Sequence, residues 1–223
     1  MRLRKTLVAA TALAALAFAA LPAIASASPT VDIEGSTHFT TSGGTALLLG
    51  SQKIHCESST GTGEFASDEG STGWIEFTFH GCTTTVLGFP VSCTSEGQPS
   101  RTITTTELEF HVMKHNGAPV ILITSNEGHF ASFNCSSVHV TVGGNGIIGA
   151  LTAPGYNEPS NTFTVEFAEA EAGGQAITTT DETGETEWRL TAQVGSGEPK
   201  PAVEVAEGTG TFTEGGTATI TKE

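Results

Sequence analysis

Alternation between apolar and polar residues constrains the fold of this chain more than any other feature. In Trp74–His80, the apolar side chains Ile75, Phe77 and Phe79 fall on one face and the polar ones on the other. One-sided alternation is typical of antiparallel strands with one face in water. The same pattern recurs in Glu107–Met113, Val138–Val142, Thr162–Phe167 and Glu187–Val194. Val120–Ile123 is apolar throughout, which predicts a central strand covered on both faces.

Turn sequences separate these segments. Asn116-Gly117 predicts a tight hairpin, because both residues tolerate positive φ, and further turns are predicted at Asp181–Gly184 and Glu214–Gly216. The 36 Thr and 12 Phe suit pleated, half-buried surfaces, and the 27 Gly suit turns. Other strands are predicted at Val31–Ile33, Ala46–Leu49, Ile54–Glu57, Ile147–Thr152, Ala176–Thr180, Gly210–Thr213 and Ala218–Thr221. We therefore expect an all-β fold: an antiparallel β-sandwich or a closed barrel of short strands.

The first 27 residues form a predicted signal peptide. Arg2, Arg4 and Lys5 make a basic head, residues 6–21 carry no charge, and Ala25-Ser26-Ala27 supplies the small residues that signal peptidase accepts. The apolar stretch is shorter than the roughly 20 residues that a membrane-spanning helix needs. We expect cleavage after Ala27, with Ala25 as the alternative, and a secreted or cell-exterior protein without a membrane span in its mature part.

Residues 28–223 are predicted to form a single β-rich domain. Residues 153–159, Ala-Pro-Gly-Tyr-Asn-Glu-Pro, are the strongest break in the pattern, and a boundary at 153–160 is the alternative. We favour a loop, because the part that follows has few bulky apolar residues and would form a thin core alone. Residues 195–201 predict a second loop, and the helix-favouring stretch Phe167–Ala172 is too short to be stable alone.

Charge excludes some partners. All 24 acidic residues but only six of the nine basic ones lie in residues 28–223, which gives that part a net charge of −18. Such a surface repels phosphate backbones and anionic membranes. We expect no binding to nucleic acid or to an anionic membrane surface.

The four cysteines, Cys56, Cys82, Cys93 and Cys135, predict two disulfides. An even number in an exported chain favours disulfides, and the spacing lacks the Cys-x-x-Cys of zinc sites. Strand parity places Cys56 and Cys135 on core-facing positions, while Cys82 and Cys93 flank a predicted loop, Thr83–Ser92. We expect the pairs Cys56–Cys135 and Cys82–Cys93.

Several segments around these cysteines resemble a group of uncharacterised exported proteins of actinobacterial type. The segments are Lys53–Cys56, Trp74–Cys82, Ser92–Gly97 and Ile103–Leu108, and the likeness covers roughly residues 50–155. The resemblance implies secretion and a cysteine-stapled β fold, and it implies no chemistry.

Polar-face residues offer one candidate metal site. Glu76, His80, Glu109 and His111 lie on the polar faces of two predicted strands, and two imidazoles with a carboxylate could hold a metal if those strands were neighbours. The alternative is that they face water, as polar-face residues usually do. We favour this alternative and expect no metal and no cofactor.

Three strand carboxylates, Glu76, Glu109 and Glu166, are candidates for glycoside hydrolysis, which needs a pair flanking a cleft. Sugar clefts also need aromatic platforms with polar edges, and the chain has one Tyr and two Trp. No Gly-x-Ser-x-Gly occurs, and Asp181–Glu187 lacks the Asp and Asn content of a calcium loop. We assign no catalytic residue. The sequence favours a non-enzymatic secreted or cell-surface β module for binding or structure, and a secreted hydrolase is the alternative.

Overall fold

We describe the protein from a computed structural model, which covers residues 29–49, 52–67, 70–167, 176–181 and 184–221. The predicted signal peptide and the stretch Ala168–Ala172 lie outside these residues. The described residues contain no helix, and the all-β prediction is confirmed. No helix in these ranges is long and apolar enough to cross a membrane.

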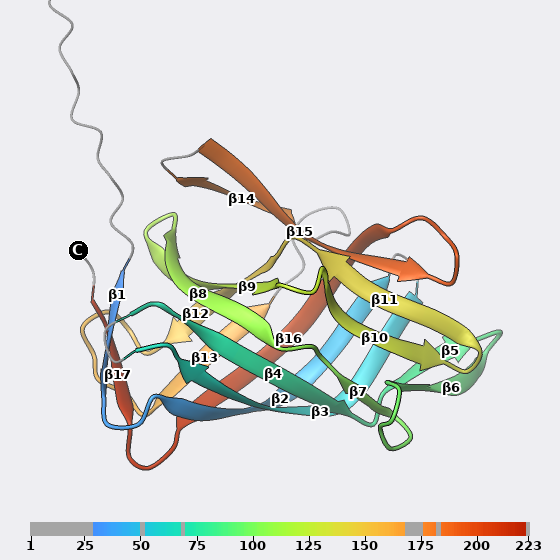
Figure 1. The fold of residues 1–223 in the computed structure, drawn as a ribbon, viewed down its shortest axis with the longest axis horizontal. Helices are drawn as coiled ribbons and strands as arrows, with labels where there is room; N and C mark the ends of the chain where they lie inside the picture. The colour runs from blue at the N-terminus through green and yellow to red at the C-terminus, as the bar shows by residue number, and fades with distance from the viewer. Residues whose placement is uncertain (1–28, 50–51, 68–69, 168–175, 182–183, 222–223) are drawn as a thin grey trace, which may run out of the picture.

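Seventeen strands make up the described structure (Figure 1). They are β1 (Thr30–Glu34), β2 (His38–Leu49), β3 (Gln52–Phe65), β4 (Thr72–His80), β5 (Thr83–Val86), β6 (Phe89–Thr94), β7 (Thr102–Thr104), β8 (Leu108–His115), β9 (Ala118–Ser125), β10 (His129–Cys135), β11 (Val138–Gly144), β12 (Ile147–Ala153), β13 (Thr162–Phe167), β14 (Ala176–Asp181), β15 (Gly184–Val194), β16 (Lys200–Phe212) and β17 (Thr217–Thr221).

Eight antiparallel strands close into a ring. The hydrogen-bonded order is β3-β2-β16-β13-β12-β9-β8-β4, and the pairing of β4 with β3 joins the last strand to the first. Apolar side chains that alternate along these strands point into the ring and form most of the core. The short β1–β17 sheet lies at one end of this ring in Figure 1, and its buried Val31 and Ile220 belong to the same core.

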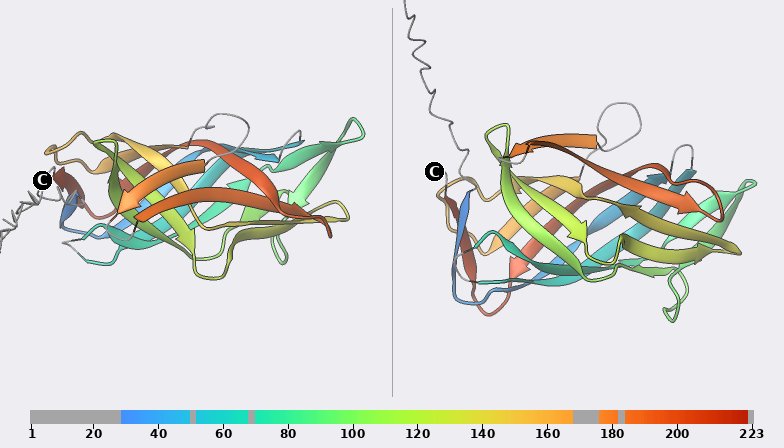
Figure 2. Two further views of the ribbon diagram at one scale, coloured as in Figure 1. Left: turned by 90° about the horizontal axis from the view of Figure 1, so that it is seen from above. Right: turned by 45° about the horizontal axis from the view of Figure 1, so that its top comes forward.

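A second closure shares three of these strands. The pairing of β15 with β16 completes a circuit through β11, β10, β6, β5, β3 and β2. The shared strands β2, β3 and β16 are 12, 14 and 13 residues long, longer than the short strands that dominate the rest of the sheet. Figure 2 shows the resulting elongated shape from two further sides.

Glycines inside the long strands explain why the sequence suggested shorter ones. A Cβ at Gly63 would lie 2.4 Å from the ring of Phe39, and one at Gly210 would lie 2.0 Å from the ring of Phe163. These positions have no room for a side chain because an aromatic ring occupies the space. In these strands a glycine therefore marks a position where an aromatic ring packs directly against the backbone. A sequence pattern that treats glycine as a turn residue predicts the end of the strand at the same position.

The alternating segments are confirmed as strands. The apolar segment Val120–Ile123 is buried at all four positions in β9. Ile121 and Ile123 face the ring, while Val120 and Leu122 form a small outer cluster with Ile148, beneath Met113 and Trp188. The Asn116-Gly117 hairpin is also confirmed, since φ is 51° and 82° at its two residues. Two residues of the turn expected at Asp181–Gly184 lie outside the described part of the chain.

The segment Thr83–Ser92 is a hairpin and not the loop that we expected. Strands β5 and β6 pair across it, and Leu87 and Gly88 form the turn with φ of 51° and 84°. Leucine at positive φ and a proline in the following strand hide this hairpin from sequence patterns. Its tip holds exposed apolar side chains, with Leu87 94% and Phe89 72% accessible.

The expected disulfide pairing is wrong. The bonds are Cys56–Cys82 and Cys93–Cys135, with Cα–Cα distances of 4.0 and 4.1 Å. Parity could not choose between pairings, because all four cysteines are buried. Cys93 and Cys135 are direct cross-strand partners of β6 and β10, a neighbourhood that the missed hairpin creates. The two bonds lie together, since the Cys93 amide donates to the Cys82 carbonyl over 3.0 Å.

Strands on both sides of the loop at residues 153–160 belong to one sheet. β12 pairs with β13 across this loop, and β16 pairs with β2 from the first part of the chain. The loop is held at one end of the ring, where the Asn157 amide donates to the Ile220 carbonyl over 2.8 Å. The two parts therefore share one core among the described residues.

Candidate functional site: an apolar cavity with one carboxyl group

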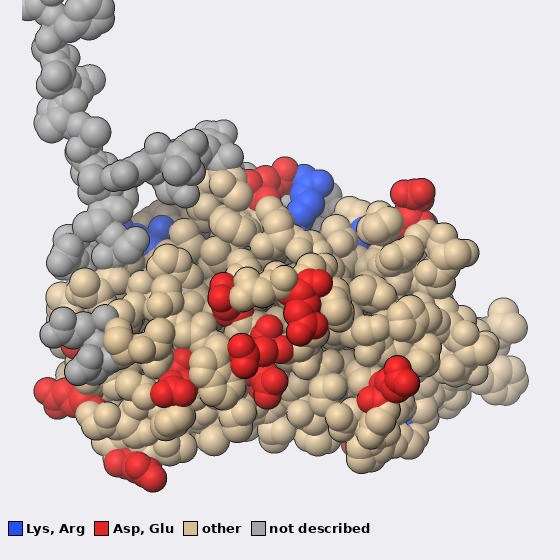
Figure 3. Space-filling view, viewed as in Figure 1, with Lys and Arg blue, Asp and Glu red and all other residues tan. Residues whose placement is uncertain are grey.

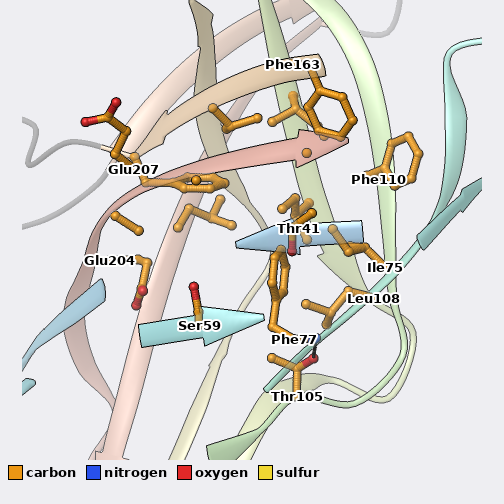
Figure 4. A pocket seen from close by; sticks show the side chains of 18 of the residues that line it. Thr41, Ser59, Ile75, Phe77, Thr105, Leu108, Phe110, Phe163, Glu204 and Glu207 are labelled. Atoms are coloured by element: carbon orange, nitrogen blue, oxygen red, sulfur yellow. Dashed lines mark hydrogen bonds between the residues drawn. The ribbon is translucent and has the colours of Figure 1, made fainter. Parts of the chain in front are cut away.

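A cavity of about 160 Å³ lies inside the closed sheet (Figure 4). Strands of the eight-stranded ring line most of it, and β1, β7, β10, β11, β15 and β17 contribute to the rest of the wall. Its wall is almost entirely apolar, and ten of the 12 phenylalanines of the chain contribute to it. They are Phe39, Phe65, Phe77, Phe79, Phe110, Phe130, Phe133, Phe163, Phe167 and Phe212. Native cores pack with few voids larger than a water molecule, so a space of this size is unusual.

A cluster of aromatic rings gives the cavity rigid walls. Phe39 makes edge-to-face contacts with Phe65, Phe110 and Phe163, with ring centroids 5.7, 5.8 and 5.1 Å apart. Its contact with Phe212 is of the same kind, at 6.1 Å. Such pairs contribute about 0.5–1.5 kcal/mol each beyond the area that they bury. The phenylalanines, which the sequence places on core-facing positions, therefore surround a cavity.

Glu204 is the ionisable residue whose carboxyl group points into this cavity. It follows Val203 on β16, and in Figure 4 its carboxyl lies on the same side of the cavity as the Ser59 hydroxyl. Burial away from water raises the pKa of Glu204 to about 8, because the ionised form loses its hydration. Within the described part of the chain, no hydrogen bond or ion pair to this carboxyl is found.

Most other polar groups of the wall are uncharged. Thr41, Ser42 and Ser59 come from β2 and β3, and the Thr105 hydroxyl is engaged in accepting from the Phe77 amide over 2.9 Å. Glu207 borders the cavity from β16, but its carboxyl points away from the cavity in Figure 4. The cavity thus combines a large apolar wall with one carboxyl group.

A β-bulge helps to set this polar side. Between Gly43 and Thr45, β2 has one residue, while β3 has two between Cys56 and Ser59. The extra residue changes which positions of β3 face inward, so that Cys56 and Ser59 both do so. Bulges re-aim side chains in this way and are common beside binding sites.

The sequence did not point to Glu204 as a cavity residue, because its two neighbours suggest that its side chain lies on the solvent face of the strand. Val203 and Val205 flank it, and period-2 reading points valines inward and glutamate outward. In the structure Val205 is 39% exposed and Glu204 faces the cavity. The signal lay in the alternate positions Ala202, Ala206, Gly208, Gly210 and Phe212, a row of small residues ending in an aromatic one.

The predicted metal-site residues do not converge. β4 and β8 are neighbours, as the hypothesis required, but His111 lies opposite Thr72 and His80 opposite Ser58. Eight residues along β4 separate these positions, about 26 Å at the usual strand rise. The described residues contain no group of three side chains suited to hold a metal.

The predicted strand carboxylates lie outside the ring. Glu76, Glu109 and Glu166 are exposed, and the Asn126 amide donates to Glu109 over 2.6 Å. They do not line the cavity, where among the described residues only Glu204 points inward. The cavity therefore lacks the carboxylate pair that glycoside hydrolysis needs. The segment Asp181–Glu187, considered above as a calcium loop, lies partly outside the described residues, and its described residues belong to β14 and β15.

The outer surface is acidic. Figure 3 shows acidic side chains dispersed over one face, with few basic ones among them. Arg101 is tied to Glu57 at 2.5 Å and donates to the Gly81 carbonyl at 3.0 Å, beside the Cys56–Cys82 bond. Arg189 pairs with Glu187.

In comparisons with known protein families, curated proteins and solved structures, none matches this chain.

Proposed function

We propose that this protein is a secreted binding module that holds a small, largely apolar molecule inside its ring of strands. The observation that carries the proposal is the cavity of about 160 Å³ lined by ten phenylalanines. An engineered apolar cavity of about 150 Å³ in another protein stays dry and binds benzene. Binding sites for small molecules are concave, mostly apolar and fitted with few polar groups, which matches this wall.

Two further features support an extracellular binding role. Two disulfides link segments of the second circuit, and such bonds persist in oxidising compartments. The predicted signal peptide agrees with that compartment. We favour a binding function over a hydrolase function. Among the described wall residues, the cavity offers one inward-pointing carboxyl group and no nucleophile–base pair.

Toluene binding tests the proposal. We expect saturating toluene to raise the melting temperature of the disulfide-intact protein by mass action and to titrate as one site in calorimetry. Ala206→Leu, which fills the cavity from β16, should raise the melting temperature without ligand and weaken toluene binding about tenfold or more.

Val205→Leu is the matched control. It enlarges the neighbouring residue of the same strand, whose side chain is 39% exposed on the other face. Toluene binding should stay at the wild-type level in this variant. Absence of any toluene effect on the wild-type protein, or equal loss of binding in both variants, would contradict the proposal.

A further inference from the structure

Glu204 places an acidic group in an apolar site. Its carboxyl points into the cavity, and no hydrogen bond or ion pair to it is found within the described part of the chain. A buried ionisable group normally has a counter-charge or several hydrogen bonds, because its desolvation costs several kcal/mol. A ligand that enters the cavity could supply the missing hydrogen-bond donor or counter-charge for the Glu204 carboxyl.

The described residues supply no cation for this carboxyl. Among the described residues, Lys53, Lys114 and Lys200 do not line the cavity, nor do Arg101 and Arg189. The described wall residues also include no histidine or tyrosine, and the remaining titratable one, Glu207, points its carboxyl outward. Leu47 lies opposite Glu204 on β2, and Leu190 belongs to the wall from β15.

The surroundings favour an ammonium group over other head groups. Aromatic rings attract cations through their faces, and a carboxylate adds a full charge to that attraction. The chain carries a net charge of −15, which draws cations towards the surface and repels anions. Once Glu204 is ionised, a carboxylate ligand would meet a like charge there, and a purely apolar ligand would leave the Glu204 carboxylate unpaired.

We propose that the cavity binds a small amphiphilic amine, with its apolar part among the phenylalanines and its ammonium group on the Glu204 carboxylate. This inference rests on the proposed function and names its ligand class. In the empty cavity near neutral pH the carboxyl holds a proton, because its pKa is about 8. When the ammonium enters, that proton leaves to solvent and the carboxylate accepts hydrogen bonds from the ligand nitrogen. Binding therefore releases about one proton at pH 7.

The test compares toluene, benzyl alcohol, benzylamine and benzoate, which present one aromatic ring with different substituents. At about pH 8.5, where both the carboxylate and the ammonium are charged, we expect benzylamine to bind about ten- to a hundredfold more tightly than toluene, as a charge-assisted hydrogen bond contributes. Calorimetry at pH 7 in buffers of different ionisation enthalpy should show proton release with benzylamine and none with toluene.

Glu204→Gln keeps the shape and removes the charge. We expect this variant to lose the preference for benzylamine while its toluene affinity stays within about threefold of wild type. Glu207→Gln, on the same strand with its carboxyl outside, is the control and should keep the preference. Denaturation midpoints of both variants verify that each is folded.

The outcomes separate the two proposals. Toluene binding without a benzylamine preference, or a preference that survives Glu204→Gln, overturns the amine inference and leaves the apolar binding site. Stronger binding of benzyl alcohol or benzoate than of benzylamine also overturns it. Failure of all four compounds to bind overturns the proposed function itself.

Discussion

At the scale of a single residue, Glu204 couples the interior of the protein to pH. Its folded-state pKa of about 8 lies above the ordinary value of 4.5. Below pH 4.5 the carboxyl is protonated in both folded and unfolded states, and the folded state has no penalty. As pH rises towards 8, the unfolded state loses its proton and gains relative stability. The contribution of Glu204 to the free energy of unfolding therefore falls between pH 4.5 and pH 8 and stays constant above pH 8.

Glu204→Gln should remove that pH dependence. The wild-type free energy of unfolding should fall relative to the variant by up to about 1.4 kcal/mol per pH unit between 4.5 and 8. Urea denaturation of both proteins from pH 5 to pH 9 measures the difference, which should widen and then become constant. Glu207→Gln should run parallel to wild type. A constant gap between wild type and Glu204→Gln over the whole range would contradict the buried position of this carboxyl.

At the scale of the elements, the disulfides hold the second circuit where its hydrogen bonding is sparse. β6 and β10 pair through two residue pairs, and β3 and β5 through one. Cys93–Cys135 and Cys56–Cys82 reinforce these two seams. By loop-closure entropy, the separations of 26 and 42 residues correspond to about 3.5 and about 4 kcal/mol.

Peptide mapping of the unreduced protein should therefore join Cys56 to Cys82 and Cys93 to Cys135, with no free thiol in the unfolded, unreduced chain. The double variant Cys93→Ala/Cys135→Ala should melt well below wild type, and Cys56→Ala/Cys82→Ala somewhat less so, in the order of their loop lengths. Peptides joining Cys56 to Cys135 would show that the structural pairing is wrong.

The sequence predicted the strand class well and the connections poorly. Segments with one-sided alternation are strands, and one of them, Thr162–Phe167 in β13, has the expected bounds. Long strands that pack glycine beneath aromatic rings, such as β3 with Gly63, break the pattern, because their inward face alternates large and small residues. Disulfide pairing and the cavity depend on which strands meet across the ring. Neither the local pattern around Cys135 nor that around Glu204 contains this information.

At the scale of the whole molecule, repulsion between the excess negative charges destabilises the folded state. The net charge is −15, and the acidic residues gather closer together in the folded chain than in the unfolded one. We expect the melting temperature to rise modestly from low to physiological NaCl, as the Debye length shrinks from about 30 Å to about 8 Å. Calcium and magnesium chloride at equal ionic strength should act alike. A fall in melting temperature with NaCl, or a calcium-selective rise, would contradict a merely solvated acidic surface.

The position of β16 in the sheet has a consequence for the order of assembly. This strand pairs with β2 and β13 in the first ring and with β15 in the second circuit, yet it occupies residues 200–212. A polypeptide emerging amino-terminus first cannot complete either closure until residues 200–212 are present. Such long-range pairings fold slowly, because the entropy of closing the loop is spent before the contacts form. Both closures therefore depend on the same late strand, and the sheet stays open until β16 pairs.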